Sequence, residues 1–234
     1  MISDEALLQR TIANNAAWCD AVCRAHGMAG SFLSDAWLNR GQTPRYYPNV
    51  ITLSRSAGRL RVAELLDQTS GAAPSVKDSF GDLDLGDAGC ELLFRAEWMV
   101  HAAAPNEPAG ESPLTWGTIT AEAELAAWEA SWTDDAGAPR TFLPVLLREP
   151  AVTFWAGRSG DEVAAGGITF ASHDVVSVSN TFFREGAALR GLVRAVAERG
   201  EGAPIVGYEH GEALRAAVAG GFRSLGPLAV WVRG

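Results

Sequence analysis

The chain has 234 residues, of which 47% are hydrophobic and 20% charged, so it has the composition of a globular protein rather than a disordered or fibrous one. This length provides enough core for one large domain or two small ones. The formal net charge of −9 argues against a nucleic-acid-binding surface, which needs clustered cations.

The same sequence lacks the features of membrane and secreted proteins. No apolar run approaches the roughly 18 residues of a membrane helix, and the acidic start has no apolar signal segment. Three cysteines do not make a disulfide framework. We therefore expect a cytoplasmic protein that binds neither membranes nor nucleic acid.

The first half mixes helix and strand patterns. A helix is predicted from residue 4 to about residue 26, because Ser3 can cap it, acidic residues fill its first turn and Gly27 ends it. Further strands are predicted at 31–38, 50–53, 74–80 and 96–103, with a helix at 60–66.

A break in the pattern follows. Residues 104–113 contain three prolines among small and acidic residues and show no periodicity. The sequence therefore predicts two domains, 1–104 and 114–234, joined by a linker at 105–113.

The second half has a clearer alternation of elements. A helix capped by Thr120 should carry Trp128 and Trp132 on one face, where core packing is their expected role. Strands are predicted at 116–119, 152–156, 163–170, 175–179, 205–208 and 228–232, and further helices at 141–148, 186–199 and 212–219.

Short segments recur at a nearly constant spacing between the halves. Ala73-Pro74-Ser75-Val76 is similar to Ala203-Pro204-Ile205-Val206, and Trp98 corresponds to Trp231. Each half also has the order strand, helix, strand, helix, strand, which favours a duplicated unit. Chance similarity between segments rich in alanine and glycine remains the alternative.

From Trp116 to Trp231 the predicted order β-α-α-β-β-β-α-β-α-β resembles that of the GNAT acetyltransferase superfamily. The hairpin segment 160–166 and the helix-to-strand junction ending in Gly221-Phe222 add to the resemblance. The resemblance implies an α/β fold with a mixed sheet, here a truncated GNAT-like unit followed by a complete one.

In that family an amine attacks the thioester of acetyl-CoA, so the resemblance implies acetyl-CoA or another acyl-CoA as the cofactor. A strand that splays from its neighbour holds the pantetheine arm, and a helix N-terminus receives the pyrophosphate. The residues implied for this binding are Val178, Ser179, Asn180, Arg184, Gly186 and Ala187.

The phosphate loop departs from the family pattern, which is Arg/Gln-x-x-Gly-x-Gly/Ala. Arg184 matches its first position, but Ala187 and Leu189 stand where the pattern has its glycines. Glu185 also adds a negative charge where the phosphates would lie.

The catalytic positions depart from the pattern as well, because Ala217 stands where the family often has its tyrosine acid. The sequence instead offers Tyr208, Glu209 and His210 at the carboxyl end of a buried strand, where open α/β sheets usually place ligands. Glu209 could then serve as the base and Tyr208 as the acid. Alternatively, Glu209 and His210 simply flank the helix that begins at Gly211.

Other clusters have structural and functional interpretations. Cys19, Cys23 and His26 share one helical face and could begin a zinc site, although small core cysteines are the commoner case. The acidic loop 81–87 is similar to a calcium loop but fits a solvated helix cap better. Lys77-Asp78-Ser79 indicates either a cleft or an ordinary polar strand end.

Two functions remain open. One is a GNAT-like acyltransferase that moves an acyl group from acyl-CoA to an amine of a small molecule or peptide. The other is a non-catalytic ligand-binding or scaffold module with a degenerate CoA loop. The sequence predicts no metal requirement and leaves a homodimer open as the assembly.

Overall fold

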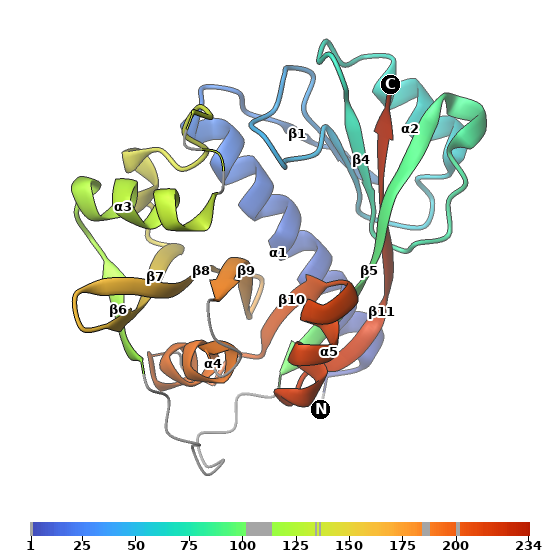
Figure 1. Ribbon diagram of the computed structural model, residues 1–234. Coiled ribbons are helices and arrows are strands. Elements are labelled where there is room, and N and C mark those ends of the chain that lie inside the picture. The colour runs from blue at the N-terminus through green and yellow to red at the C-terminus, as the bar shows by residue number, and fades with distance from the viewer. Residues whose placement is uncertain (1, 102–113, 134, 136, 184–187, 200–201) are drawn as a thin grey trace. The chain divides into compact units, whose positions relative to one another are not determined.

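The computed structural model describes residues 2–101, 114–133, 135, 137–183, 188–199 and 202–234 (Figure 1). It divides into two compact units. Unit 1 comprises Met1–Trp98, Tyr208–Leu214 and Ser224–Gly234, and unit 2 comprises Met99–Gly207 and Arg215–Arg223. The predicted linker at 105–113 lies outside the described residues, so the boundary proposed there stays a prediction.

Unit 1 combines two helices with a mixed set of strands. Its strand order is β1-β2-β3-β4-β11-β5, with β3 and β4 parallel and the pairs β1–β2, β2–β3 and β4–β11 antiparallel. The elements are α1 (Asp4–Ala25), β1 (Ser31–Phe32), β2 (Ala36–Leu38), β3 (Val50–Thr52), α2 (Arg59–Leu66), β4 (Ser75–Asp78), the 3-10 turn η1 (Gly86–Ala88), β5 (Cys90–His101), which continues into unit 2, and β11 (Arg223–Arg233).

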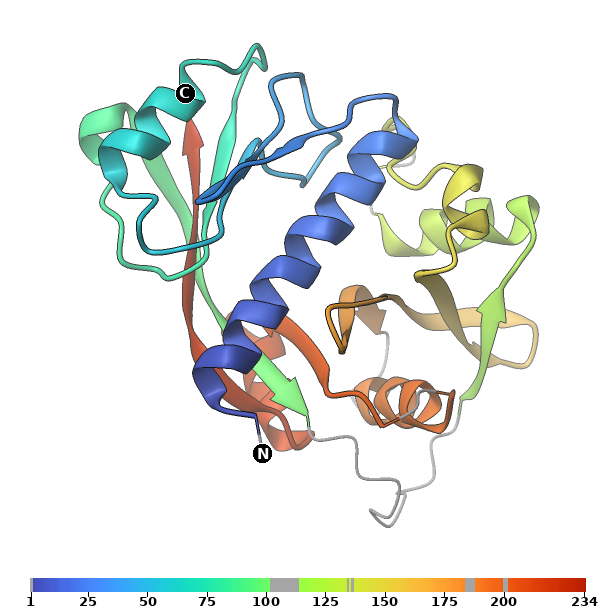
Figure 2. The ribbon, with the colours of Figure 1, turned by 180° about the vertical axis from the view of Figure 1, so that it is seen from behind.

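The two helices of unit 1 cover opposite faces of its strands. Trp231 of β11 belongs to a core cluster with Val62 of α2, whereas its neighbour Val230 belongs to a cluster with Ile12 of α1. Successive residues of a strand point to opposite faces, so this alternation is expected. Lys77 of β4 pairs with Val230 in the antiparallel register and so lies on the α1 face. Figure 2 shows the blue helix α1 beside the strands of unit 1.

Unit 2 has the strand order β10-β9-β8-β7-β6, in which β9 and β10 are parallel and the remaining pairs antiparallel. Part of β10 and part of α5 belong to unit 1. The elements are β6 (Thr115–Ile119), α3 (Glu122–Trp132), the 3-10 turn η2 (Pro144–Arg148), β7 (Val152–Ser159), β8 (Glu162–Ser172), β9 (Val175–Phe183), α4 (Ala188–Arg199), β10 (Ile205–Glu209) and α5 (Gly211–Ala219).

Two adjacent glycines of β8 show how the layers of unit 2 are arranged. A Cβ atom added at Gly166 would lie 2.4 Å from Trp128 Nε1 of α3, and one added at Gly167 would lie 2.7 Å from Leu192 Cδ2 of α4. Because adjacent strand residues face opposite ways, α3 and α4 pack on opposite faces of β8 (Figure 1). Unit 2 is therefore a helix–sheet–helix sandwich.

The predicted α/β class and mixed strand arrangement are confirmed, and α1 has the expected Ser3 cap, whose Oγ accepts from the Ala6 N–H at 3.3 Å. Two local predictions are wrong. The stretch 31–38 forms two short antiparallel strands because the chain turns back at Leu33, whose N–H donates to the Ala36 carbonyl. The predicted helix at 141–148 is only a 3-10 turn that starts at Pro144.

The start of α3 also differs from its prediction. The N-cap is Ala121 rather than Thr120. The Glu124 carboxylate accepts from the backbone N–H groups of Thr120 and Ala121 at 3.5 and 3.4 Å. The Glu124 carboxylate thus makes the reciprocal bond of a capping box, from the first turn back to the N-cap backbone.

The order of elements is the same in both halves. It runs β3, α2, β4, η1, β5 in the first half and β9, α4, β10, α5, β11 in the second. In each half the first two of these strands are parallel neighbours. The duplication remains a prediction, whose test is the superposition of Pro74 on Pro204 and of Trp98 on Trp231.

Candidate functional site

The parallel pair β9–β10 is the part of unit 2 that the resemblance assigns to the cofactor. Its register joins Val176 with Ile205 and Ser177 with Val206, and no further partners follow. Strand β9 nevertheless continues to Phe183. Strand β9 therefore runs on for several residues without a registered partner on its β10 side.

The same stretch of β9 is irregular on its β8 side. The register shifts between Gly166 and Ile168, so that Ser179 faces Ile168 while Phe182 faces Gly166. Asn180 lies at this shift and has a φ of 50°, a left-handed conformation that asparagine tolerates better than most residues. Bulges of this kind redirect backbone groups and are frequent beside functional sites.

Gly207 marks the point where the two strands stop pairing. A Cβ atom there would lie 2.8 Å from the carbonyl oxygen of Val178, closer than real Cβ atoms approach. Of the implied cofactor residues, Val178, Ser179 and Asn180 thus lie together on the irregular stretch of β9, beside or just beyond Gly207. Their role in binding the cofactor stays a prediction.

The implied phosphate loop is only partly described. Arg184, Gly186 and Ala187 lie outside the described residues, so the structure does not test their predicted roles. Helix α4 is described from Ala188 onward, and the half-buried Leu189 belongs to its first turn. The core residues Leu192 and Val193 are buried, as the predicted helix register requires.

The three predicted catalytic residues fall in unit 1, around the carboxyl end of β10. The Tyr208 hydroxyl lies 3.2 Å from Lys77 Nζ, and the His210 ring stacks on Phe94 with a centroid separation of 4.8 Å. Glu209 is half-buried. Tyr208 and His210 are therefore packed against unit 1 residues, while their catalytic roles remain predictions.

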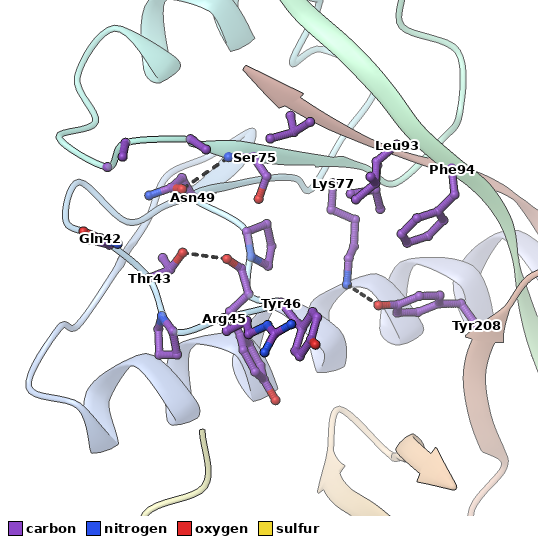
Figure 3. A pocket seen from close by; sticks show the side chains of 18 residues that line it. Gln42, Thr43, Arg45, Tyr46, Asn49, Ser75, Lys77, Leu93, Phe94 and Tyr208 are labelled. Carbon is purple, nitrogen blue, oxygen red and sulfur yellow. Dashed lines mark hydrogen bonds between the residues drawn. The ribbon is translucent and has the colours of Figure 1, made fainter. Parts of the chain in front are cut away.

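Tyr208 lines a pocket within unit 1 that the sequence predicted only in part. The pocket has a volume of about 470 Å³ and is lined by loop 42–49, residues 71–73 and side chains of β4, β5, β10 and β11 (Figure 3). The polar cluster at Lys77 had indicated a cleft, but the contribution of Tyr46 and Tyr47 was not foreseen. The sequence shows only that lysine and tyrosine are rare in this chain. The structure shows that the only lysine and all three tyrosines line this pocket.

Lys77 is the charged group of this pocket. Its side chain is 4% exposed, and Nζ donates to Asn15 Oδ1 at 2.8 Å and to the Tyr208 hydroxyl at 3.2 Å. Burial is the largest effect on the pKa of Lys77 and acts to lower it, whereas the interactions with Tyr208 and Cys19 act to raise it, and the net shift is upward. Nζ is the donor in both hydrogen bonds, as expected of an ammonium group.

The neighbouring residue Asp78 has a structural role. Its carboxylate accepts from the Phe80 N–H at 3.1 Å and from the Leu83 N–H at 2.9 Å, so it organises the turn after β4. Burial raises the pKa of Asp78, partly offset by these hydrogen bonds. Asp78 does not line the pocket.

The cysteine cluster belongs to the core of unit 1. Cys19 and Cys23 are 2% and 0% exposed, and burial is the main reason that both thiols have a raised pKa. Protonated, buried thiols are poor metal ligands. Within the described residues, no group of three or more His, Cys, Asp or Glu side chains is arranged to hold a metal.

Comparison with solved structures decides the fold. A functionally unknown conserved protein from Staphylococcus epidermidis matches with a TM-score of 0.60 at 10% identity, covering 87% of this chain and 92% of that one. A GCN5-related N-acetyltransferase from Kribbella flavida matches with a TM-score of 0.58 at 13% identity, covering 93% and 95%. The chain has the GNAT fold.

A third solved structure supports this fold assignment. A putative acetyltransferase of the GNAT family from Novosphingobium aromaticivorans matches with a TM-score of 0.57 at 13% identity, covering 92% of this chain and 94% of that one. No protein-family model and no curated protein matches the sequence. The GNAT fold of this chain is therefore visible in its structure, while identities this low say nothing of its substrates.

Proposed function

We propose that this protein transfers an acyl group from acyl-CoA to an amine of a small molecule or peptide. The observation that carries the proposal is the geometry of β9 and β10, a parallel pair that loses its register after Ser177 and Val206. The bulge at Asn180 lies in the same stretch of β9. Backbone groups freed from strand pairing can hydrogen-bond the amide groups of a pantetheine arm.

The proposed reaction is a direct transfer. The lone pair of the amine attacks the thioester carbonyl carbon, so that a C–N bond forms and the C–S bond breaks. The attacking nitrogen loses a proton to a base, and the leaving thiolate takes up a proton from an acid. We assign the base to Glu209 and the acid to Tyr208 on the strength of the sequence alone.

The start of α4 argues for weak cofactor binding. Leu189 is half-buried in the first helical turn, and the sequence places Glu185 three residues before the helix. A helix N-terminus attracts phosphates through its free N–H groups and dipole, and a nearby carboxylate opposes that attraction. We therefore propose an acyl-CoA affinity that is low compared with that of an intact glycine loop.

The second candidate function is a ligand-binding module without catalysis. The pocket around Lys77 in unit 1 favours this function, because it has the size of a small-molecule site. The two functions differ in what they predict for acetyl-CoA, which only the acyltransferase needs to bind.

Hydrogen exchange with and without acetyl-CoA tests the proposal directly. We expect slower exchange at residues 176–183 and at the first turn of α4, since the pantetheine arm and pyrophosphate would cover these amides. Turnover is measured in parallel as thiol release from acetyl-CoA with a panel of primary amines. If millimolar acetyl-CoA slows amide exchange only in other segments, or in none, the acyltransferase proposal is contradicted.

The Glu209→Gln variant separates binding from chemistry. If Glu209 is the base, the variant should keep the protection of β9 but lose roughly 100-fold or more in turnover. Glu212→Gln, three residues further along on α5, is the matched control and should keep full turnover. Equal turnover of both variants would show that Glu209 is not the base.

The setting of this activity is also a proposal. We place the protein in the cytoplasm, where its three free cysteines stay reduced. Within the described residues, no helix combines the length and apolarity needed to cross a membrane. We expect no nucleic-acid partner, in line with the acidic net charge.

A further inference from the structure

The pocket of unit 1 has an unusual chemistry for so acidic a chain. Its lining residues include two cations, Lys77 and Arg45, and no aspartate or glutamate. The protein as a whole carries a formal net charge of −9. The lining therefore contributes cationic and no acidic side chains, a composition that favours anionic ligands.

Lys77 lines this pocket, and both of its hydrogen-bond partners are neutral. Its ammonium donates to an amide oxygen of Asn15 and to the Tyr208 hydroxyl, and it lies 4.3 Å from the centre of the Tyr208 ring. Among the residues that the structure describes, no carboxylate pairs with it. A buried charge without a counter-charge is costly, and an anionic ligand would remove that cost.

The hydrogen-bonding capacity at Lys77 matches a single carboxylate. An ammonium has three donors, and Asn15 and Tyr208 accept two of them, so one N–H is left for a ligand. The Tyr208 hydroxyl accepts from Lys77 and so can turn its own proton toward the same ligand. Together the two groups present two donors, as the two oxygens of a carboxylate require.

The remaining walls suit an apolar or aromatic ligand body. Leu93 and Phe94 of β5 line the pocket (Figure 3), together with Val230 and Val232 of β11. The volume of about 470 Å³ lies within the usual range for small-molecule sites. A compact carboxylate with one or two rings would fill it.

The loop that forms the outer wall is held in place before any ligand binds. The buried Asn49 donates from Nδ2 to the Gly41 carbonyl at 2.8 Å and accepts at Oδ1 from the Ser75 N–H at 3.3 Å. Thr43 Oγ1 donates to the Tyr47 carbonyl at 2.6 Å. A preformed wall lowers the entropy lost on binding.

One residue of this loop carries backbone strain. Tyr46 has a φ of 73°, a conformation that bulky residues rarely adopt, and its side chain is 64% exposed. The Arg45 guanidinium lies 4.7 Å from the centre of the Tyr46 ring. Strain of this kind often accompanies binding sites, where it sets a side chain in position for a ligand.

We propose that unit 1 binds a small carboxylate with an apolar body in this pocket, with the carboxylate on Lys77 and Tyr208. The proposal shares Tyr208 with the acyltransferase proposal, which uses it as the acid, but none of the residues proposed to bind acyl-CoA takes part in it. It also predicts that amines bind poorly here, since Lys77 and Arg45 would repel them. The acceptor amine of the proposed reaction would therefore be a different ligand.

A matched pair of probes tests the charge requirement. We would titrate the full chain with 2-naphthylacetate and with the neutral, nearly isosteric 2-naphthylacetamide by calorimetry. The carboxylate should bind roughly tenfold or more tightly than the amide, as expected for hydrogen bonds to a charged group. Equal affinity of the two probes, or no binding of either, would overturn the proposal.

The single lysine of the chain allows the binding position to be checked as well. Protein labelled with ¹³Cε-lysine should give one side-chain NMR signal, from Lys77. Naphthylacetate should shift this signal with the same affinity as the calorimetric titration, and the amide should shift it less. Binding that leaves the signal unmoved would place the ligand elsewhere and contradict the proposal.

Two substitutions complete the test. Lys77→Met should abolish the preference for the carboxylate and leave acetyl-CoA binding unchanged. The two measurements therefore test the carboxylate site and the acyltransferase proposal separately. Arg59→Gln removes one exposed cation from the same unit outside the pocket and should keep the preference. If Lys77→Met does not fold, Tyr208→Phe should still weaken carboxylate binding several-fold; an unchanged preference in either folded variant would overturn the proposal.

Discussion

At the scale of single residues, Gly166 shows how closely α3 approaches the sheet of unit 2. A Cβ atom at this position would lie 2.4 Å from Trp128 Nε1 and 2.4 Å from Phe182 Cε1. Trp128 is fully buried and donates from Nε1 to the Trp155 carbonyl at 2.8 Å, so its ring has little freedom to move. The glycine is therefore required by packing.

The Gly166→Ala substitution should lower the free energy of unfolding by about 2 kcal/mol, because the added methyl group overpacks a rigid aromatic core. Denaturant titration measures the change. Gly117→Ala in β6 is the matched control, since a Cβ there meets nothing within 4 Å, and it should be neutral or slightly stabilising. Equal effects at both positions would contradict this account of the core.

A second residue-scale prediction concerns pH. Burial raises the pKa of Asp78 in the folded protein, so the folded state binds this proton more tightly than the unfolded chain does. The contribution of Asp78 to the unfolding free energy is thus largest below the unfolded pKa and declines as pH rises through the folded pKa. The stability difference between wild type and Asp78→Asn should fall across that window, as measured by denaturant titrations at several pH values. A difference that rises with pH would contradict the direction of the shift.

At the scale of elements, Glu129 fixes helix α3 to the chain segment that follows it. Its carboxylate accepts from the Thr141 and Phe142 N–H groups at 2.6 and 3.0 Å and pairs with Arg140 at 3.0 Å. The Glu129 side chain is almost fully buried. These bonds position Phe142 in the aromatic cluster around Trp128.

Replacing Glu129 with Gln should destabilise the protein by about 2 kcal/mol, because two backbone donors and Arg140 lose a charged acceptor. Thermal unfolding with the exposed Glu122→Gln as control would measure the difference. Both variants remove one negative charge from the same helix. A loss of stability seen only in Glu129→Gln is therefore due to the buried contacts of its carboxylate. A loss of the same size in both would attribute the effect to helix charge.

The elements themselves followed largely from the sequence. Helical periodicity and the Ser3 cap located α1, and alternation around a turn located β7 and β8. The site was harder to predict from the sequence. The register shift at Asn180 depends on pairing between strands, which a single sequence does not encode locally. Loop 42–49 was missed for the same reason, since Asn49 and Ser75 meet only in the folded chain.

The phosphate loop gives a further prediction at this scale. Combining Ala187→Gly and Leu189→Gly with Glu185→Gln should strengthen acetyl-CoA binding, because phosphate oxygens gain access to backbone N–H groups and lose a repulsive charge. The two glycines at a helix start should cost roughly 1–2 kcal/mol of stability, so folding is checked by circular dichroism. A folded variant without gain in affinity would favour the ligand-binding module.

At the scale of the whole molecule, a GNAT fold covers nearly the entire chain, and the two ligands that we propose are assigned to different units. We assign acyl-CoA to the β9–β10 pair of unit 2 and a small carboxylate to the pocket of unit 1, which is lined by the only lysine and all three tyrosines of the chain. The fold alone does not decide which of these sites is used. Their ligands differ in chemistry, so each can be measured separately.

The central claim is that unit 2 still binds acyl-CoA despite its altered loop. Calorimetric titration of the wild-type protein with acetyl-CoA tests this claim most directly. We predict saturable one-to-one binding that is weak, with a dissociation constant on the order of 0.1–1 mM, or about −4 to −5.5 kcal/mol. The absence of any binding at millimolar acetyl-CoA would contradict the acyltransferase proposal, and nanomolar binding would contradict the interpretation of the loop.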